Sequence, residues 1–352
     1  MKRRPSAVEE RRPAMPEKEK NMKIAAYEVR PDEKPVIESL CKEYGIELVS
    51  TPANLDPTTA NMAVGCDGVT TLGQSDYCNE VLDELRGYGV KVLASRCVGY
   101  NHMNCDYARS LGFRLCNGAY APNGVAEYTV MAILMCIRKF KKALYNTNDN
   151  DFTLKGKMGR ELRTMTVGVM GTGKIGYTVI KCLSGFGILA NDVYQNDAVR
   201  QYAEYVDLDT LYRESDIITI HTPLLPETTG MINRDALSKM KDGVVLIDNA
   251  RGELVDIDAI IEGVETEKIG ALFMDAFPGE TGIIHVPHND DIIKTPGMPY
   301  FKLKYLRSFV NVYHTPHMAF FTEEAAESMA RCGIDSIHEI LTTGKSSHEI
   351  PC

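Results

Sequence analysis

Short apolar segments alternate with amphipathic segments along most of this chain. Strands that are separated by helical crossovers pair in parallel, and strands that are apolar throughout are typical of sheets covered on both faces. The sequence therefore predicts an α/β protein with parallel sheets. The first series of predicted strands is Lys23–Tyr27, Ile46–Ser50, Gly68–Leu72, Lys91–Ser95 and Phe113–Cys116. The second series is Thr166–Met170, Ile188–Asn191, Ile217–His221, Val244–Asp248, Ala271–Asp275 and Val312–Thr315.

One long helical pattern, Asn123–Tyr145, joins the two series of strands. It contains the run VMAILMCI and is apolar around most of its circumference, so other structure must cover several of its sides. A junction between domains or an interface between subunits would provide that cover. Amphipathic patterns between strands of the first series, among them Lys34–Tyr44 and Asn79–Tyr88, predict crossover helices.

The length of 352 residues suits two domains better than one core. Residues 1–21 are charged, contain proline and carry almost no large apolar side chains. Such a segment buries too little apolar surface to offset its loss of conformational entropy. We therefore expect a disordered tail, with folded structure beginning at Met22.

Composition and charge argue against several classes of function. The formal net charge of −9 disfavours a nucleic-acid partner. No apolar run is long enough to cross a bilayer, and no signal peptide is recognisable. The ten cysteines include no C-x-x-C pair, and several, such as Cys66, Cys136 and Cys182, lie in apolar segments where we expect burial. This pattern indicates a reducing cytoplasm and no metal site. A zinc site built from His285, His288 and a cysteine remains an alternative.

A glycine-rich turn links the strand Thr166–Met170 to a helical pattern. In dinucleotide-binding sites the first glycine permits a tight turn, the second lets the pyrophosphate approach, and the third lets the helix pack against the strand. The N–H groups at the helix N-terminus then face the pyrophosphate. An ordinary strand–helix turn is the alternative. The residues of the turn are Gly171, Thr172, Gly173, Lys174, Ile175 and Gly176.

Asp192 follows the next predicted strand. A carboxylate at this place can accept hydrogen bonds from the adenosine ribose, and it repels the 2′-phosphate of NADP. Asp192 therefore favours NAD as the cofactor. The alternative is an aspartate that only opens a turn, since the sequence VYQND around it is also typical of turns.

Seven motifs occur in an order that identifies a known family. With them, the chain from Met22 to about Gly344 resembles the D-isomer-specific 2-hydroxyacid dehydrogenases. It is most similar to the branch of D-lactate, D-2-hydroxyisocaproate and vancomycin-resistance D-lactate dehydrogenases. The motifs are SRCVGYNHMN at 95–104, YAPNGVAEYT at 120–129, VGVMGTGKIG at 167–176, HTPLLPETTGMIN at 221–233, DNARGELVD at 248–256, MDAF at 274–277 and HTPHMAFFTEEA at 314–325.

The resemblance implies two Rossmann- or flavodoxin-like domains with a cleft between them. The NAD-binding domain, residues 122–317, would be inserted into a discontinuous substrate domain formed by residues 22–121 and 318–352. The resemblance also implies a homodimer built largely on the linking helix. The reaction would be reversible hydride transfer between NADH and a small 2-oxo acid, giving the D-2-hydroxy acid.

Arg251 and His317 are the predicted catalytic side chains. Arg251 lies at the carboxyl end of a predicted strand, where open α/β sheets bind ligands, and its guanidinium can clamp a carboxylate with two hydrogen bonds. A lone arginine is more often a surface ion-pair partner, but motif and location favour the site. His317 resembles the family's general acid/base in preference to His314, and imidazole suits proton transfer near neutral pH.

The resemblance also implies the contacts around substrate and cofactor. The peptide N–H groups of Val98 and Gly99, with Tyr100 beside them, would cradle the substrate carboxylate. Phe320 and Phe321 would lie near its side chain, although plain core aromatics are an equal alternative. On the cofactor side, Asp275 would bind the nicotinamide carboxamide, Ala250 would precede Arg251 on the cofactor-facing loop, and the turn at Thr222 and Pro223 would lie near the adenosine.

The sequence departs from the family pattern beside the catalytic histidine. A glutamate usually stands three residues after the Asp275 position and hydrogen-bonds the histidine, but this chain has Pro278 there. We expect Glu280 to take its place after a rearrangement of one loop. Alternatively, His317 works without a carboxylate, or catalysis is weakened. An NAD(H)-binding regulator on the same scaffold, like the family's corepressors, is therefore the competing hypothesis.

A second departure lies before Asp192, where GFGILAND is about two residues shorter than in the family. A shift of two residues preserves the alternation of side chains along a strand, so Asp192 can still point the same way. The preference for NAD over NADP is therefore an expectation that depends on where Asp192 lies.

Overall fold

The computed structural model describes residues 21–280, 284 and 299–351. They divide into two compact units. The first comprises the described part of Met1–Ala119 together with Met329–Cys352, and the second comprises the described part of Tyr120–Ser328. The predicted disordered tail, residues 1–21, lies outside the described residues except for Asn21.

The first unit contains one five-stranded parallel sheet in the order β2-β1-β3-β4-β5. This is the flavodoxin-like order, in which ligands bind beyond the carboxyl ends of the strands. Each strand lies within its predicted range. The strands are β1 (Lys23–Ala26), β2 (Glu47–Ser50), β3 (Gly68–Thr71), β4 (Val92–Ser95) and β5 (Arg114–Cys116).

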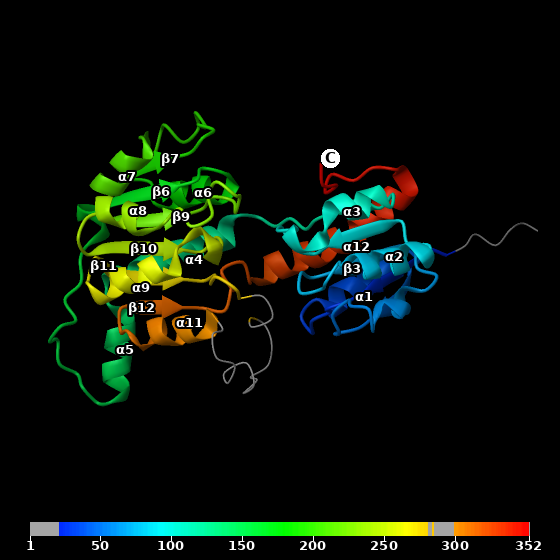
Figure 1. Ribbon diagram of the computed structural model, residues 1–352, viewed down its shortest axis with the longest axis horizontal. Helices are drawn as coiled ribbons and strands as arrows, with labels where there is room; N and C mark the ends of the chain where they lie inside the picture. The colour runs from blue at the N-terminus through cyan, green and yellow to red at the C-terminus, as the bar shows by residue number, and fades with distance from the viewer. Residues whose placement is uncertain (1–20, 281–283, 285–298, 352) are drawn as a thin grey trace, which may run out of the picture. The chain divides into compact units, whose positions relative to one another are not determined.

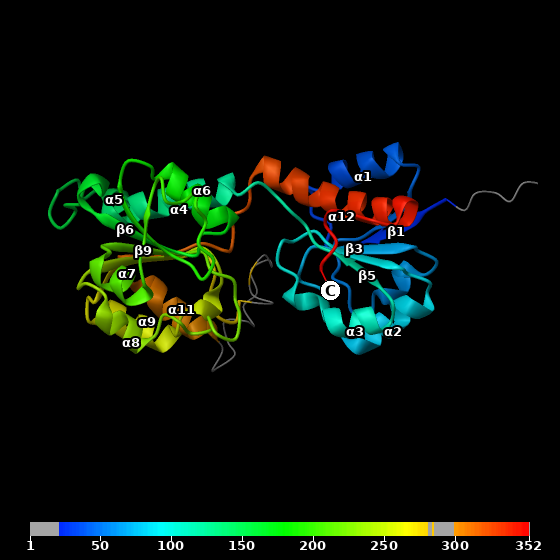
Figure 2. The same ribbon diagram turned by 90° about the horizontal axis from the view of Figure 1, so that it is seen from above.

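Helices cover both faces of this sheet. In Figure 2, α1 and α12 lie on one face, and α2 and α3 lie on the other. Two buried clusters match these layers, one containing Ile37 and Ile337, the other Val81 and Leu85. The helices are α1 (Lys34–Glu43), α2 (Asn79–Gly87), α3 (Cys105–Ser110) and the later part of α12 (Glu323–Thr343), with short 3-10 helices η1 (Ala60–Ala63) and η2 (Asn101–Met103).

The second unit contains a seven-stranded parallel sheet in the order β12-β11-β10-β9-β6-β7-β8 (Figure 1). The chain order reverses between β6 and β9, which makes the carboxyl ends of these two strands the expected ligand site. The strands are β6 (Thr166–Met170), β7 (Gly187–Asn191), β8 (Glu204–Tyr205), β9 (Ile217–Ile220), β10 (Val244–Asp248), β11 (Ile269–Met274) and β12 (Val312–His314).

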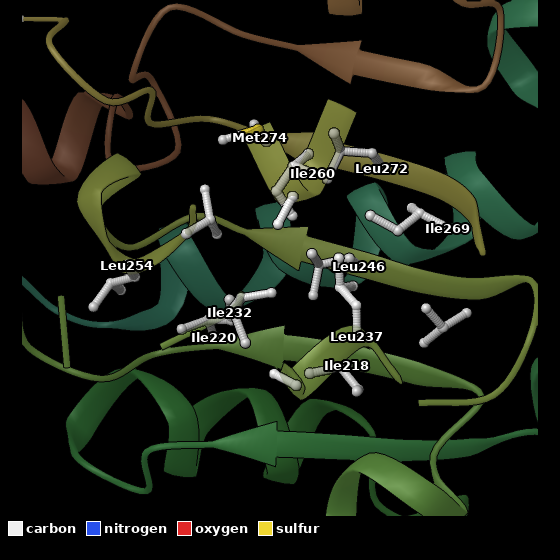
Figure 3. Close-up of a cluster of buried hydrophobic side chains, with 14 of the residues drawn as sticks. Ile218, Ile220, Ile232, Leu237, Leu246, Leu254, Ile260, Ile269, Leu272 and Met274 are labelled. Atoms are coloured by element: carbon white, nitrogen blue, oxygen red, sulfur yellow. The ribbon is translucent and has the colours of Figure 1, made fainter. Parts of the chain in front are cut away.

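Helices again pack on both faces. Figure 3 shows Leu246 of β10 and Leu272 of β11 meeting Leu237 of α8 and Ile260 of α9 in one buried cluster. A second cluster joins the opposite face of the sheet to α4 and α6. The helices are α4 (Asn123–Ile137), α5 (Phe140–Asn148), α6 (Lys174–Cys182), α7 (Leu208–Glu214), α8 (Arg234–Lys239), α9 (Ile257–Glu265), α11 (Pro299–Ser308) and the start of α12, with 3-10 helices η3 (Leu162–Thr164) and η4 (Gly252–Leu254).

Polar side chains fix where three of these helices begin. Asp207 accepts a hydrogen bond from Thr210 N before α7, Asn233 accepts one from Ala236 N before α8, and Asp256 accepts one from Ala259 N before α9. Each of these side chains satisfies an N–H group that has no partner within the helix.

The two parallel sheets confirm the fold class predicted from the sequence, with two α/β units and the second inserted in the first.

The structure differs from the sequence-based predictions in three places. The linking pattern is not one helix, because the chain breaks between α4 and α5 at Lys139, whose φ is +52°. The two-residue edge strand β8 was not predicted. Cys182, the last residue of α6, is exposed rather than buried, whereas Cys66 and Cys136 are buried.

The second boundary between the units falls within α12, after Ser328, and not after residue 317 as predicted. Residues just beyond His317 are tied to the second unit: the backbone N–H groups of Met318 and Ala319 both donate to the carboxylate of Asp275. None of the helices in the described part of the chain is long and apolar enough to span a membrane.

Candidate active site

The glycine-rich turn has the geometry that a dinucleotide site requires. Gly171 has φ +89°, and a Cβ there would lie 2.6 Å from the carbonyl oxygen of His221. A Cβ on Gly176 would lie 2.0 Å from the carbonyl oxygen of Gly171, so only glycine lets α6 pack this closely. Gly173, by contrast, has open space where a Cβ would stand. A pyrophosphate therefore has room to approach Gly173 and the N–H groups of Lys174 and Ile175 at the start of α6.

Asp192 lies directly beside this turn. Its Oδ2 accepts hydrogen bonds from Thr172 N at 2.5 Å and from Thr172 Oγ1 at 3.1 Å, and its Oδ1 accepts one from Tyr194 N at 2.9 Å. The residue after β7 therefore places a carboxylate against the glycine-rich turn. Thr172 was predicted only as a member of the turn, and its contact with Asp192 was not predicted, because the residue between the first two glycines varies freely in the pattern.

Two further loops flank the same crevice. The backbone N of Thr222, which follows β9, would lie 2.9 Å from a Cβ on Gly171, so this residue borders the glycine-rich turn. Pro223 continues that loop, and its carbonyl oxygen accepts a hydrogen bond from Thr228 Oγ1. At the end of β10, Ala250 N donates to Asp248 Oδ1 at 3.0 Å, which turns the chain toward Arg251.

His317 is held in an unusual backbone conformation by Asp275. His317 has φ +51°, and its N–H donates to Asp275 O at 2.8 Å. The carboxylate of Asp275, which is 1% exposed, accepts from Thr315 Oγ1 at 2.6 Å, from Met318 N at 2.9 Å and from Ala319 N at 2.7 Å. One buried carboxylate thus binds both sides of the loop that carries the imidazole.

These contacts add a structural role for Asp275 to the one implied by the family resemblance. Three of roughly four acceptor positions of its carboxylate are used within the protein, so about one remains for a carboxamide. The role of Thr315 was not predicted, although its position one residue before Pro316 marks it as the start of the turn.

The imidazole of His317 is paired with Glu280. Nδ1 of His317 lies 2.5 Å from Oε1 of Glu280, and the two side chains are 25% and 14% exposed. Burial alone would lower the pKa of His317, but the hydrogen bond and the charge of Glu280, assisted by Asp275, outweigh burial and Arg251 and raise it. The imidazolium form is therefore stabilised in this site.

A tight turn brings Glu280 to the histidine. Gly279 has φ +76°, and Glu280 N donates to Phe277 O at 3.1 Å, as in a type II turn with Pro278 at its first central position. Glu280 Oε2 accepts from Phe277 N at 2.9 Å, which fixes the carboxylate. Pro278 and Gly279 therefore form the turn that presents the Glu280 carboxylate to the imidazole.

Arg251 lies at the carboxyl end of β10 on the same unit. Its Nη1 donates to the carbonyl oxygen of Ala250 at 2.7 Å, and it forms no ion pair with any carboxylate in the described ranges. Its positive charge opposes the rise in the pKa of both His317 and Asp248. Burial nevertheless raises the pKa of Asp248 to about 7. Arg251 thus offers a half-buried cation beside the imidazole.

Aromatic side chains border the imidazole. The ring centroids of His317 and Phe320 are 6.3 Å apart with an edge-to-face arrangement, and those of Phe320 and Phe321 are 6.0 Å apart. Phe321 is 48% exposed, so it is not a core residue. The ring centroids of Phe320 and Tyr120 are 6.1 Å apart.

The predicted carboxylate cradle lies on the first unit, in the loop after β4. Val98 and Tyr100 are exposed, and Gly99 is half-buried. No acceptor among the described residues takes a hydrogen bond from the N–H of Val98 or Gly99. Two adjacent peptide donors are therefore available to an anionic group.

Within the described ranges, no three His, Cys, Asp or Glu side chains lie close enough together to bind a metal ion. The alternative zinc ligands His285 and His288 lie outside the described residues.

Comparison with known proteins identifies the family. Residues 130–319 match the family model of the D-isomer specific 2-hydroxyacid dehydrogenase, NAD binding domain. The aromatic 2-oxoacid reductase of Clostridium sporogenes (strain ATCC 15579) is 39% identical over 336 residues, which cover 94% of this chain and all of the relative. The D-lactate dehydrogenase of Escherichia coli (strain K12) is 35% identical over 323 residues, covering 91% of this chain and 97% of the relative.

Solved structures agree with these relatives. The structure of D-2-hydroxyisocaproate dehydrogenase superposes with a TM-score of 0.84 at 31% identity, covering 94% of this chain and 99% of that one. The D-lactate dehydrogenase of Lactobacillus jensenii, solved with NAD+, superposes with a TM-score of 0.80 at 32% identity, covering 94% of this chain and all of that one. The chain therefore belongs to the D-isomer-specific 2-hydroxyacid dehydrogenases, a family of NAD-dependent oxidoreductases.

Proposed function

We propose that this protein reduces small 2-oxo acids to D-2-hydroxy acids, reversibly, with NADH as the hydride donor. The observation that best supports this proposal is the hydrogen bond between the His317 imidazole and Glu280. Asp275 holds the loop that carries His317 through hydrogen bonds from Thr315 and Met318. This acid/base group lies on the unit that also carries the glycine-rich turn and Asp192.

His317 donates the proton in this scheme. Bound NADH supplies a hydride to carbon 2, and the 2-oxygen then needs one proton. Because Nδ1 of His317 is hydrogen-bonded to Glu280, the transferred proton is the one on Nε2. The raised pKa of His317 keeps the donor protonated near neutral pH. In the oxidative direction the neutral imidazole accepts the same proton.

Arg251 binds the substrate carboxylate and polarises the 2-oxo group. Its guanidinium has no carboxylate partner among the described residues, so it can form two charge-assisted hydrogen bonds with a substrate. From the family resemblance, we also propose that the N–H groups of Val98 and Gly99, with Tyr100 beside them, bind the substrate carboxylate.

The substrates we propose are 2-oxo acids with a small aliphatic or aromatic side chain, of the pyruvate, 2-oxoisocaproate and phenylpyruvate class. The exposed ring of Phe321 and the ring of Phe320 beside His317 support an apolar side-chain site. The test is NADH oxidation with these three acids, followed by chiral analysis of the product. Turnover yielding the D-isomer supports the proposal, whereas NADH binding without turnover on any of them refutes it.

The competing hypothesis, an NAD(H)-binding regulator, rested on the loss of the glutamate at Pro278. Glu280 supplies a carboxylate to His317 at hydrogen-bond distance, so that argument no longer favours the regulator. The same assay separates the two functions, because a regulator would bind NADH and leave every 2-oxo acid unreduced.

A homodimer is the proposed assembly. Helices α4 and α5 and the segment after them expose a row of large apolar side chains, which a second copy of the chain would cover. We expect the wild-type chain to be a dimer by light scattering and Leu154→Glu, at an 86% exposed position, to shift it toward monomer. A monomeric wild type would contradict this assembly. The exposed residues are Met131, Leu134, Phe140, Leu144, Tyr145, Phe152, Leu154 and Met158.

We also propose that the protein acts in the cytoplasm, without a nucleic-acid or membrane partner. All described cysteines are free thiols, as a reducing compartment would keep them. Titration of the denatured, unreduced protein with a thiol reagent should therefore detect every cysteine. A shortfall that a reductant restores would point to an oxidising compartment.

A further inference from the structure

The two peptide groups that would cradle the substrate carboxylate are oriented by a neighbouring segment, residues 117–118. Asn117 Nδ2 donates a hydrogen bond to the carbonyl oxygen of Val98 at 2.7 Å. The backbone N–H of Gly118 donates to the carbonyl oxygen of Cys97, also at 2.7 Å. No described peptide bond is cis. In a trans peptide the C=O and N–H point in opposite directions, so the N–H groups of Val98 and Gly99 must point away from the segment that holds the two carbonyls.

The root of this loop is fixed separately from its tip. Arg96, which is 0% exposed, pairs with the buried Glu33 at 3.1 Å and donates from Nη2 to Tyr27 O at 2.8 Å. A Cβ on Gly118 would lie 2.6 Å from the carbonyl oxygen of Arg96, so glycine is required for the close approach. A change at the half-buried Asn117 side chain therefore alters the tip of the loop and leaves the buried root in place.

We propose that Asn117 is a positioning residue for the substrate carboxylate: by holding the Val98 carbonyl, its side-chain amide turns the Gly99 N–H toward that carboxylate. The inference rests on the proposed function, in which Val98 and Gly99 bind the acid. The carboxylate does not react, so its contacts are the same in the ground state and in the transition state. Loss of the Asn117 hydrogen bond should then raise KM for the 2-oxo acid and leave kcat unchanged.

The experiment uses two nearly isosteric variants of the full-length protein. Asn117→Leu removes the donor, and we expect roughly a 3- to 10-fold increase in KM for the 2-oxo acid, the value of one ordinary hydrogen bond. Asn117→Asp also turns an anion toward the Val98 carbonyl and the incoming carboxylate, so its KM should rise further. The Kd of NADH should remain within twofold in both variants, since the glycine-rich turn lies on the other unit.

Asn311→Asp is the matched control. Asn311 Nδ2 also donates to a backbone carbonyl, that of Gly270 at 3.1 Å, but it lies on the second unit before β12. Its KM and kcat should equal those of the wild type. The order wild type, Asn117→Leu, Asn117→Asp in rising KM, with kcat and NADH affinity unchanged, supports the proposal.

Two results overturn the role of Asn117 while leaving the proposed function intact. One is an unchanged KM in Asn117→Leu and Asn117→Asp when the wild type is active. The other is a joint change of KM, kcat and NADH affinity, which would show general distortion of the fold. A wild type that turns over no 2-oxo acid refutes the proposed function itself and the role of Asn117 with it.

Discussion

Substitution Glu280→Gln tests the acid/base pair most directly. In the wild type one carboxylate oxygen lies 2.5 Å from Nδ1 of His317, and the other accepts from Phe277 N at 2.9 Å. Glutamine keeps the shape of the side chain but has only one acceptor oxygen. It can therefore serve either the imidazole or the Phe277 N–H, and the second group loses its acceptor.

The expected loss follows from the kind of bond that is removed. A hydrogen bond between charged groups contributes about 1.5 to 3 kcal/mol, which corresponds to a decrease of about 10- to 150-fold in reductive kcat/KM. The His317 and Glu280 side chains are 25% and 14% exposed, so solvent screens the pair only weakly. We expect the loss to lie in the upper part of that range.

The pH dependence of reductive kcat/KM should also change in Glu280→Gln, in a direction that the pKa of His317 determines. Glu280 raises the pKa of His317, whereas burial and Arg251 lower it. Without the carboxylate, the pKa of His317 must fall, so the proton donor is lost at a lower pH. The alkaline decline of reductive kcat/KM should therefore begin at a lower pH in Glu280→Gln than in the wild type.

The assay is reductive kcat/KM against pH with the best 2-oxo acid, and Glu253→Gln is the matched control. Glu253 Oε1 accepts a hydrogen bond from Gly279 N at 3.3 Å, so this variant removes an equal charge beside the same turn without touching the imidazole. An unchanged profile in Glu280→Gln, or an equal displacement in Glu253→Gln, would refute Glu280 as the partner of His317.

Three further substitutions test other parts of the site. Arg251→Lys replaces the planar fork with a point charge and should lower kcat/KM by about 10- to 150-fold, the value of one charge-assisted hydrogen bond, while fluorescence titration finds the Kd of NADH unchanged. Gly171→Ala places a residue with a side chain at φ +89°, and its Cβ would lie 2.6 Å from the carbonyl oxygen of His221. This variant should lower the free energy of unfolding by at least about 2 kcal/mol and abolish NADH binding. The pKa of the buried Asp248 is raised from 3.8 to about 7, so wild-type stability falls as pH rises across that interval, by as much as about 4 kcal/mol. Asp248→Asn should flatten this fall in urea denaturation at pH 4 to 8, and an unchanged slope would show that Asp248 ionises normally.

The elements predicted from the sequence are those whose pattern lies within a few neighbouring residues. Mostly apolar strands such as Val244–Asp248 were placed at their observed bounds, since hydrophobic runs between turns mark buried parallel strands. The break at Lys139 carried no such signal, because neither glycine nor proline occurs there. Helix α5 is instead positioned by tertiary contacts, including Lys141 Nζ to the carbonyl oxygens of Phe309 and Val312 and Lys141 N to the hydroxyl of Tyr313. Contacts between residues so far apart in sequence cannot be derived from local pattern.

In the candidate site, too, some features were predicted from the sequence and others were not. Residue type and motif position were enough to predict roles for Gly171, Arg251 and His317, because the reaction that the resemblance implied requires their chemistry. The bonds of Asn117 and Thr315 could not be predicted, since each is a side chain that meets a loop from another strand. Such supporting residues vary in type, and only three-dimensional geometry shows which backbone group each one holds.

Different carboxylates control the position and the protonation of the His317 imidazole. Asp275 sets the position, because it accepts hydrogen bonds from the Thr315 hydroxyl before His317, from the N–H of His317, and from the N–H groups of Met318 and Ala319 after it. Glu280 raises the pKa of His317 from a turn that Pro278 and Gly279 form. Because the two carboxylates act on different parts of the loop, loss of the Glu280 carboxylate should lower the pKa of His317 and leave the backbone conformation of His317 unchanged.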